Sequence, residues 1–140
     1  MSNLQLRNIA RYHAEMPEKV ARERKARQLV AKDMAHVLTA YSDGQVRWKA
    51  SKTDLMEALH WTWLNDTLAN DDGSPCEFCQ IVERACRLFR ISEPPNPRCL
   101  VSHAMIKKGV RSTSLCHRCA MIALMEDTRH PLMKFIDIPQ

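Results

Sequence analysis

The spacing of apolar residues predicts a long helix near the start of the chain. Between Pro17 and Tyr41 the apolar side chains recur every three or four residues and fall on one helical face, which comprises Val30, Met34, Val37 and Tyr41. Pro17 suits the first turn, because its missing N–H would have no helical partner there. The half before Leu29 is almost wholly charged. We therefore expect that half to project into solvent or onto a partner.

Two further helix starts carry capping signals. Ser51 is followed three residues later by Asp54, so each side chain can accept the other residue's backbone N–H. Ser74, Pro75 and Glu77 repeat this start signal. We predict one helix after each serine. Their buried faces comprise Leu55, Met56, Leu59, Trp63 and Leu64 in the first helix, and Phe78, Ile81, Val82, Ala85, Leu88 and Phe89 in the second.

Prolines divide the second half of the chain. The S-E-P-P-N-P stretch at 92–97 cannot be helical, because each proline disfavours helix in the residue before it. The pattern predicts a short helix over 98–106 and another over about 115–126. A basic turn joins them, and the apolar tail over 132–138 is expected to add a strand to a sheet edge. An extended piece is expected over 45–49.

The composition favours one folded, mainly α-helical unit. The chain has 140 residues, 45% apolar content and only three glycines. Its longest apolar run is far shorter than the ~20 residues that span a membrane. The N-terminus carries no apolar signal segment, so we expect a cytoplasmic, reducing environment. We divide the chain into an N-terminal helical region over 1–44, a dimerising element or basic arm, and a helical domain over 45–140.

Charge is segregated along the chain. The net charge is +5, with ten Lys and Arg against five Asp and Glu in residues 1–50. Residues 51–95 reverse the balance with four against eight, and residues 96–140 carry seven against three. Basic segments flanking an acidic middle suit contact with a polyanion along one surface. A solvated helix face would give a similar pattern.

Two Cys-x-x-Cys motifs are the strongest chemical signal in the sequence. Each supplies two thiolates at the spacing that one tetrahedral zinc ion needs. Together the pairs would complete a structural four-sulfur site with no open position for catalysis. The predicted ligands are Cys76, Cys79, Cys116 and Cys119.

Other interpretations of the cysteines stay open. Free cysteine is often buried as a small hydrophobe, and both pairs repeat at helical spacing. The 36 residues between the pairs exceed the usual separation in four-cysteine modules. His103 is an alternative fourth ligand, while Cys86 and Cys99 are expected to be core thiols. Disulfides are the least favoured interpretation in a reducing compartment.

Several short motifs after Val46 carry a family resemblance. They are W-x-x-S-K at 48–52 leading into L-M-E at 55–57, the turn at 70–73, F-R-I at 89–91 and the basic stretch over 96–112. In this order they resemble the C-terminal part of RteC-type regulators from Bacteroides conjugative elements, over about 80 residues. The resemblance implies a helix-turn-helix or winged-helix DNA-binding domain that regulates genes of mobile elements. The cysteine pairs and residues 1–47 fall outside the pattern.

The basic turn before the last helix is the predicted DNA contact. It combines cations, hydroxyls and backbone N–H groups, which phosphate oxygens accept together. The predicted contact residues are Arg98, Lys107, Lys108, Arg111 and Arg118. No metalloprotease, nucleophile-elbow or P-loop motif occurs, so we do not expect an enzyme. The alternative function is a zinc-stabilised protein-interaction adaptor that docks through the helix over 17–41.

Overall fold

A computed structural model describes residues 3–65, 68–106 and 114–139, with side chains from Pro17 onward except that of Ile106. These residues form five α-helices: α1 Asn3–Ala40, α2 Lys52–Leu64, α3 Phe78–Phe89, α4 Pro97–Ile106 and α5 Leu115–Glu126. A 3-10 helix, η1 Pro131–Phe135, precedes the short strand β2 Ile136–Asp137. That strand pairs antiparallel with β1 Arg47–Trp48, so Trp48 lies opposite Ile136. The expected mainly α-helical fold is confirmed.

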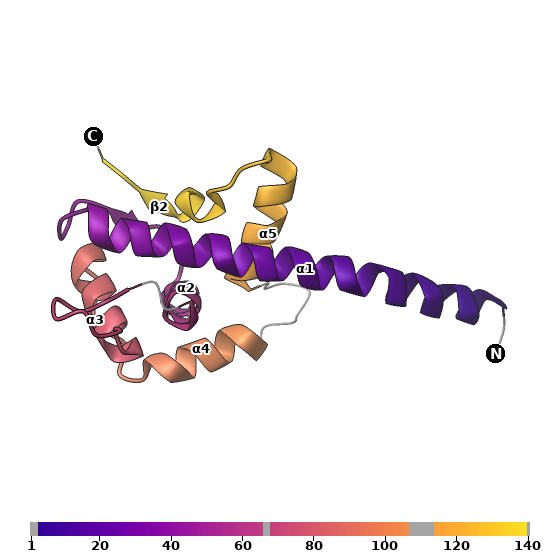
Figure 1. Cartoon of the computed structure of the whole chain (residues 1–140), viewed down its shortest axis with the longest axis horizontal. Coiled ribbons are helices and arrows are strands. Elements are labelled where there is room, and N and C mark those ends of the chain that lie inside the picture. Colours follow the sequence, from indigo (N-terminus) through magenta and orange to yellow (C-terminus); the bar gives the residue numbers. More distant parts are fainter. Residues whose placement is uncertain (1–2, 66–67, 107–113, 140) are drawn as a thin grey trace.

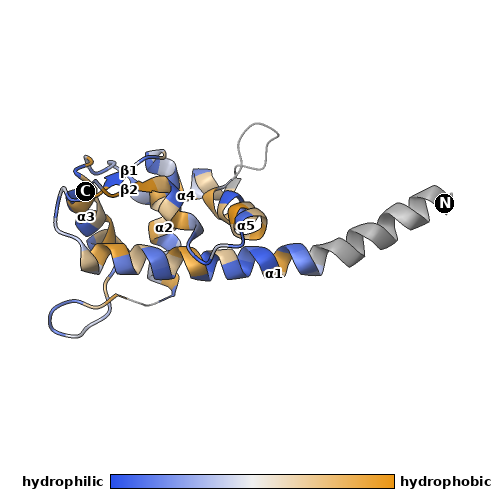
Figure 2. Ribbon diagram, turned by 90° about the horizontal axis from the view of Figure 1, so that it is seen from above, coloured by the Kyte–Doolittle hydropathy of each residue, from blue (hydrophilic) through white to orange (hydrophobic). Residues whose placement is uncertain are grey.

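α2 lies at the centre of the packed helices. α1 crosses the whole body and contacts α2, α5 and η1, while α3 and α4 cover other sides of α2 (Figure 1). Figure 2 shows that hydrophobic residues gather where these helices meet, whereas α1 is mostly hydrophilic just beyond α5. No described helix is both long and apolar enough to cross a membrane.

The local signals placed α2 and α5 correctly. Ser51 Oγ accepts the Asp54 N–H at 3.0 Å, and Asp54 Oδ2 accepts the Ser51 N–H at 3.4 Å. This reciprocal cap begins α2 as predicted. α5 begins at Leu115, after the N-cap residue Ser114.

Two predicted helix starts were wrong. α1 already includes residues 3–16, so Pro17 lies inside the helix and not in its first turn. An internal proline forfeits one backbone hydrogen bond, but the chain on either side of it is helical. α3 begins at Phe78 with Glu77 as its N-cap. Ser74 is used instead in a turn, where its N–H and its hydroxyl both contact Asp72.

The second half of α1 belongs to the core, so the region over 1–44 is not only the dimerising element or basic arm that we expected beside the domain over 45–140. Val30, Met34 and Val37 are fully buried in the same cluster as Leu55 and Leu59 of α2. The apolar faces of the two helices cover each other, because neither could stay exposed to water without cost.

Truncating an α1 core residue should therefore destabilise the whole protein. We expect Met34→Ala to lower the free energy of unfolding by about 2–5 kcal/mol, because it leaves a cavity in the core. Val20→Ala is the matched control on the same helix; Val20 is 46% exposed and its loss should change stability by less than about 0.5 kcal/mol. Urea denaturation followed by circular dichroism measures both. Equal, small effects would show that α1 contributes little to the core.

Candidate nucleic-acid interface

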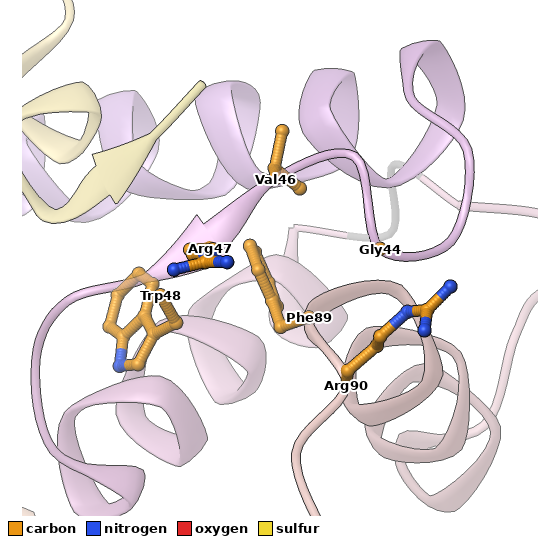
Figure 3. A pocket seen from close by; sticks show the side chains of 6 residues that line it. All are labelled: Gly44, Val46, Arg47, Trp48, Phe89 and Arg90. Carbon is orange, nitrogen blue, oxygen red and sulfur yellow. The ribbon is translucent and has the colours of Figure 1, made fainter. Parts of the chain in front are cut away.

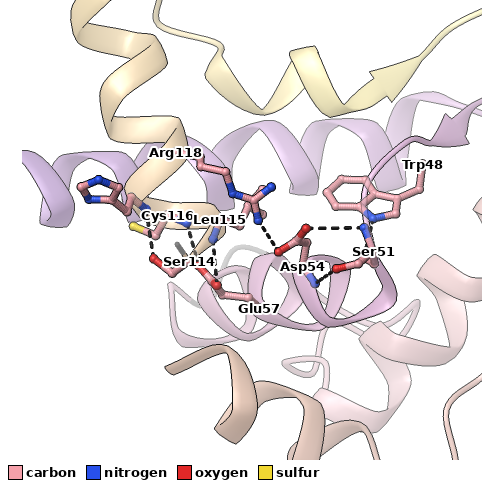
Figure 4. A network of polar contacts seen from close by, with 9 residues as sticks. Trp48, Ser51, Asp54, Glu57, Ser114, Leu115, Cys116 and Arg118 are labelled. Atoms are coloured by element: carbon pink, nitrogen blue, oxygen red, sulfur yellow. Dashed lines mark hydrogen bonds and ion pairs between the residues drawn. The ribbon is translucent and has the colours of Figure 1, made fainter. Parts of the chain in front are cut away.

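A buried glutamate joins α2 to the start of α5. The Glu57 side chain is on α2, and the residue is only 1% exposed. Its Oε1 accepts the Leu115 N–H at 3.0 Å, and its Oε2 accepts the Cys116 N–H at 2.7 Å (Figure 4). One carboxylate thus satisfies two of the N–H groups that the first helical turn leaves without intrahelical partners.

Burial and hydrogen bonding act on Glu57 in opposite directions. Removal from water raises the pKa of its carboxyl above the ordinary 4.5, and the charge of Asp54 adds to that rise. The N–H groups of Cys116 and Leu115 oppose the rise in pKa, because they stabilise the ionised form. The net direction is upward, so burial outweighs the hydrogen bonds.

The start of α5 does not offer the free backbone donors that the sequence suggested for phosphates. Glu57 takes the N–H groups of Leu115 and Cys116, and Ser114 Oγ accepts the His117 N–H at 3.1 Å. A carboxylate at this end is also the favoured partner of the helix dipole. These three N–H groups are therefore not free for a phosphate, while residues 107–113 of the turn lie outside the described residues.

Arg118, one of the predicted DNA contacts, instead makes intramolecular contacts. Its Nη2 forms an ion pair with Asp54 Oδ1 (Figure 4). Its guanidinium also lies over the ring of Phe135 at 5.6 Å from the centroid. Asp54 is at the same time part of the cap with Ser51, whose carbonyl accepts the Trp48 Nε1–H at 2.8 Å. Arg118 therefore ties α5 to the start of α2.

The solvent-facing side of α1 is basic where this helix extends past the other packed helices. Four cations of this stretch are exposed: Lys19, Arg22, Arg24 and Lys25. Glu23, in the middle of them, turns inward: its carboxylate lies 3.8 Å from His117 Nδ1 of α5, and its carbonyl accepts the Cys116 thiol at 3.4 Å. The fold thereby places the Glu23 carboxylate, with its side chain 29% exposed, beside α5, while Glu18 stays exposed.

Arg98 is an exposed cation on α4, as a DNA contact requires. Its guanidinium lies 5.5 Å from the centroid of Trp63 and 5.2 Å from that of Phe78, so two aromatic faces orient it. His60 packs against the same rings, and burial, together with the charge of Arg98, lowers its pKa. The other predicted contacts, Lys107, Lys108 and Arg111, lie outside the described residues.

The structure does not gather the predicted zinc ligands. Cys76 is buried beside Asn70, at 3.4 Å from its Oδ1, and Cys79 is exposed. Cys116 and Cys119 are buried on α5. Across residues 17–65, 68–105 and 114–139, no three His, Cys, Asp or Glu side chains converge as metal ligands. The two Cys-x-x-Cys pairs thus lie in separate environments.

The thiols of α5 pack as small hydrophobes. Burial raises the pKa of both Cys116 and Cys119 to about 12, and the nearby charge of Glu57 adds to each rise. Cys86 is in the core as predicted, whereas Cys99 is exposed on α4 and that prediction was wrong. All six cysteines are free thiols.

Comparison of the chain with protein-family models, with curated proteins and with solved structures finds no match. The resemblance to RteC-type regulators therefore stays a hypothesis based on the short motifs alone.

Sequence reasoning did not identify Glu57 as a site residue. It lies inside an apolar stretch of α2, between Met56 and Ala58. A lone carboxylate on such a face was itself the available signal, because a charged group is rarely buried without partners. Its partners lie 58 and 59 residues further along the chain, and no local pattern indicates them.

Removing the Glu57 carboxylate should loosen α5. We expect Glu57→Ala to lower the free energy of unfolding by about 2 kcal/mol or more, because it leaves two buried N–H groups without acceptors. Glu83→Ala, at an exposed position of α3, is the control and should stay within about 0.5 kcal/mol of the parent. Urea denaturation of the three proteins gives the comparison. A loss no larger than that of the control would mean that water replaces the carboxylate.

Thiol reactivity should separate free from metal-bound cysteines. In the folded protein, the exposed Cys79 and Cys99 should react rapidly with a disulfide reagent. Cys116 should react far more slowly, because it is buried and its raised pKa leaves roughly a thousandfold less thiolate than the ordinary value of 9.0. Mass spectrometry of labelled peptides gives the order, and elemental analysis gives the zinc content. Protection of Cys79 together with one zinc per chain would establish the four-sulfur site instead.

Proposed function

We propose that this chain is a DNA-binding transcriptional regulator, acting on genes of mobile elements as the resemblance to RteC-type regulators implies. The observation that carries the proposal is the exposed basic stretch of α1. Electrostatic attraction to phosphates supplies most of the sequence-independent affinity of such proteins for duplex DNA. The overall charge of +5 acts in the same direction. No catalytic step is part of the proposal.

The α1 stretch suits a phosphate backbone in its geometry. Lys19, Arg22 and Lys25 are spaced three residues apart, so they follow one side of the helix over successive turns. α1 extends past the packed helices at this end, which leaves its surface accessible to a large partner (Figure 1). The exposed surface of α1 would also be accessible to a second copy of the chain, so a homodimer is compatible with the proposal.

α4 supplies a second element of the proposed interface. Arg98 is exposed near its start, and the chain after its last residue contains Lys107, Lys108 and Arg111. In the proposed helix-turn-helix-like arrangement, α4 and α5 flank this basic segment. Zinc bound by the cysteine pairs belongs to the proposal as a structural cofactor, and it would require a different placement of the two pairs.

One observation favours the alternative, a protein-interaction adaptor. Three apolar side chains of α5 are exposed at helical spacing: Met121 at 42%, Leu124 at 59% and Met125 at 78%. Unbranched, flexible methionines are common on surfaces that bind other proteins. An adaptor of this kind would bind DNA weakly and without strong dependence on salt.

The salt dependence of duplex binding tests the proposal. Fluorescence anisotropy with a labelled duplex should show affinity falling steeply with salt, because each neutralised phosphate releases counterions. Arg22→Ala/Lys25→Ala should flatten the slope of log affinity against log salt by roughly 2 units, about 0.9 per lost contact. Alanine is a strong helix former, so α1 should persist. Arg98→Ala should flatten the slope by about 1 unit.

A charge-matched control separates local contact from net charge. Arg87 lies 3.5 Å from Asp43 and Lys134 lies 2.8 Å from Glu126, so both cations already face carboxylates. Arg87→Ala/Lys134→Ala removes the same charge and should leave the slope unchanged. Weak, salt-independent binding by the parent protein would favour the adaptor. An unchanged slope in the α1 variant would move the interface to Lys107, Lys108 and Arg111.

A further inference from the structure

A pocket of ≈ 400 Å³ lies where the turn after α1 meets the end of α3. It is lined by Gly44, Val46, Arg47, Trp48, Phe89 and Arg90 (Figure 3). Its volume falls in the range of small-molecule and cofactor sites. None of these residues belongs to the proposed α1 and α4 interface.

Gly44 shapes one side of this pocket. Its N–H donates to the carbonyl of Leu88 at 2.8 Å, which draws the turn onto the last residues of α3. Its φ of +81° is a conformation that side-chain-bearing residues rarely adopt. A Cβ here would lie 2.2 Å from Arg90 Nε, so glycine leaves the space that the guanidinium occupies.

Aromatic rings form a fixed surface within the pocket. Trp48 and Phe89 lie 5.9 Å apart between ring centroids, and Phe135 supports the indole at 6.4 Å. The Trp48 Nε1–H donates to the Ser51 carbonyl at 2.8 Å, which fixes the ring orientation. The indole is half-buried, so part of it faces the pocket. A planar ligand can stack on such a surface with little ordering cost.

Two arginines supply positive charge at the pocket. Arg47 and Arg90 are both exposed, and Phe89 stands between them (Figure 3). Within the part of the chain that the structure describes, neither guanidinium has a carboxylate within 4.0 Å. Arg87, one turn earlier, does pair with Asp43. A guanidinium without a carboxylate partner is well suited to bind phosphate oxygens in a bidentate manner.

We propose that this pocket binds a nucleotide, with the base stacked on Trp48, the phosphate held by Arg47 beside it, and Arg90 adding positive charge on the other side of Phe89. The site goes beyond the proposed function, because it requires no duplex contact. A free nucleotide and one nucleotide of a single strand share this chemistry. The first would make the pocket an effector site, and the second would make it an additional contact for an unpaired strand.

Calorimetric titration of the full chain tests the proposal with four probes. They are adenosine 5′-monophosphate, adenosine, inorganic phosphate and a short single-stranded oligodeoxyadenylate. We expect the monophosphate or the oligonucleotide to bind, and adenosine and phosphate alone to bind at least about tenfold more weakly, because each probe lacks one of the two interactions. Binding by the monophosphate identifies a free nucleotide as the ligand, whereas binding by the oligonucleotide alone identifies a strand.

Variants then assign the binding to the pocket. Arg47→Gln/Arg90→Asn should weaken binding by at least about tenfold. Asparagine is chosen at position 90 because the residue there has a φ of +54°, which asparagine tolerates well. Arg129→Gln/Lys134→Gln removes the same charge elsewhere and should bind as the parent does. Circular dichroism checks that each variant is folded.

Four results would overturn the proposal: no binding of either nucleotide probe by the parent, equal binding by the pocket variant, or adenosine or phosphate alone binding as tightly as the monophosphate. The comparisons with adenosine and phosphate need no variant, so they test the proposal even if a substitution disturbs folding. The duplex titration is a separate measurement, so failure of the pocket would leave the proposed DNA-binding function intact.

Discussion

The burial of Glu57 is the interaction on which the arrangement of the helices depends. A carboxylate in the core carries a desolvation cost of several kcal/mol unless its oxygens are hydrogen-bonded. The first turn of a helix has the complementary problem, because its N–H groups lack partners. Docking the start of α5 on α2 solves both at once, since Glu57 accepts the N–H groups of Leu115 and Cys116. If α5 moved away from α2, the Glu57 carboxylate would lose both of these donors, and the two N–H groups would lose their acceptor.

The same docking distributes charge between the interior and the surface. Asp54 is engaged by Arg118, Glu57 by backbone donors, and Glu23 by His117. Asp54 and Glu57 are therefore buried where α2 meets α5, and Glu23 of α1 is partly buried beside them. Lys19, Arg22, Arg24 and Lys25 of α1, by contrast, remain exposed. The basic surface on which the proposed DNA binding rests thus follows from packing as much as from composition.

Much of the secondary structure was predictable because its causes are local. The reciprocal cap of Ser51 and Asp54 and the stripe of α3 from Phe78 to Phe89 depend on residues within one or two turns. The limits of α5 followed from the same kind of signal. Where a local signal had two uses, the prediction failed. Ser74 could cap a helix or close a turn, and the contact with Asp72 decided for the turn.

The site depended on contacts that no local pattern specifies. The cysteine spacing determined that each pair could bind a metal, but only the packing of α5 decided that Cys119 would be buried away from the exposed Cys79. The sequence likewise determined that the first half of the 17–41 helix is basic. Only the fold directed the Glu23 side chain toward His117 of α5. The pocket beside Trp48 exists because Gly44 and Arg90 meet across 45 intervening residues. Helical periodicity is determined by neighbours a few residues apart, but the burial of a charge or a thiol depends on what the rest of the chain places against it.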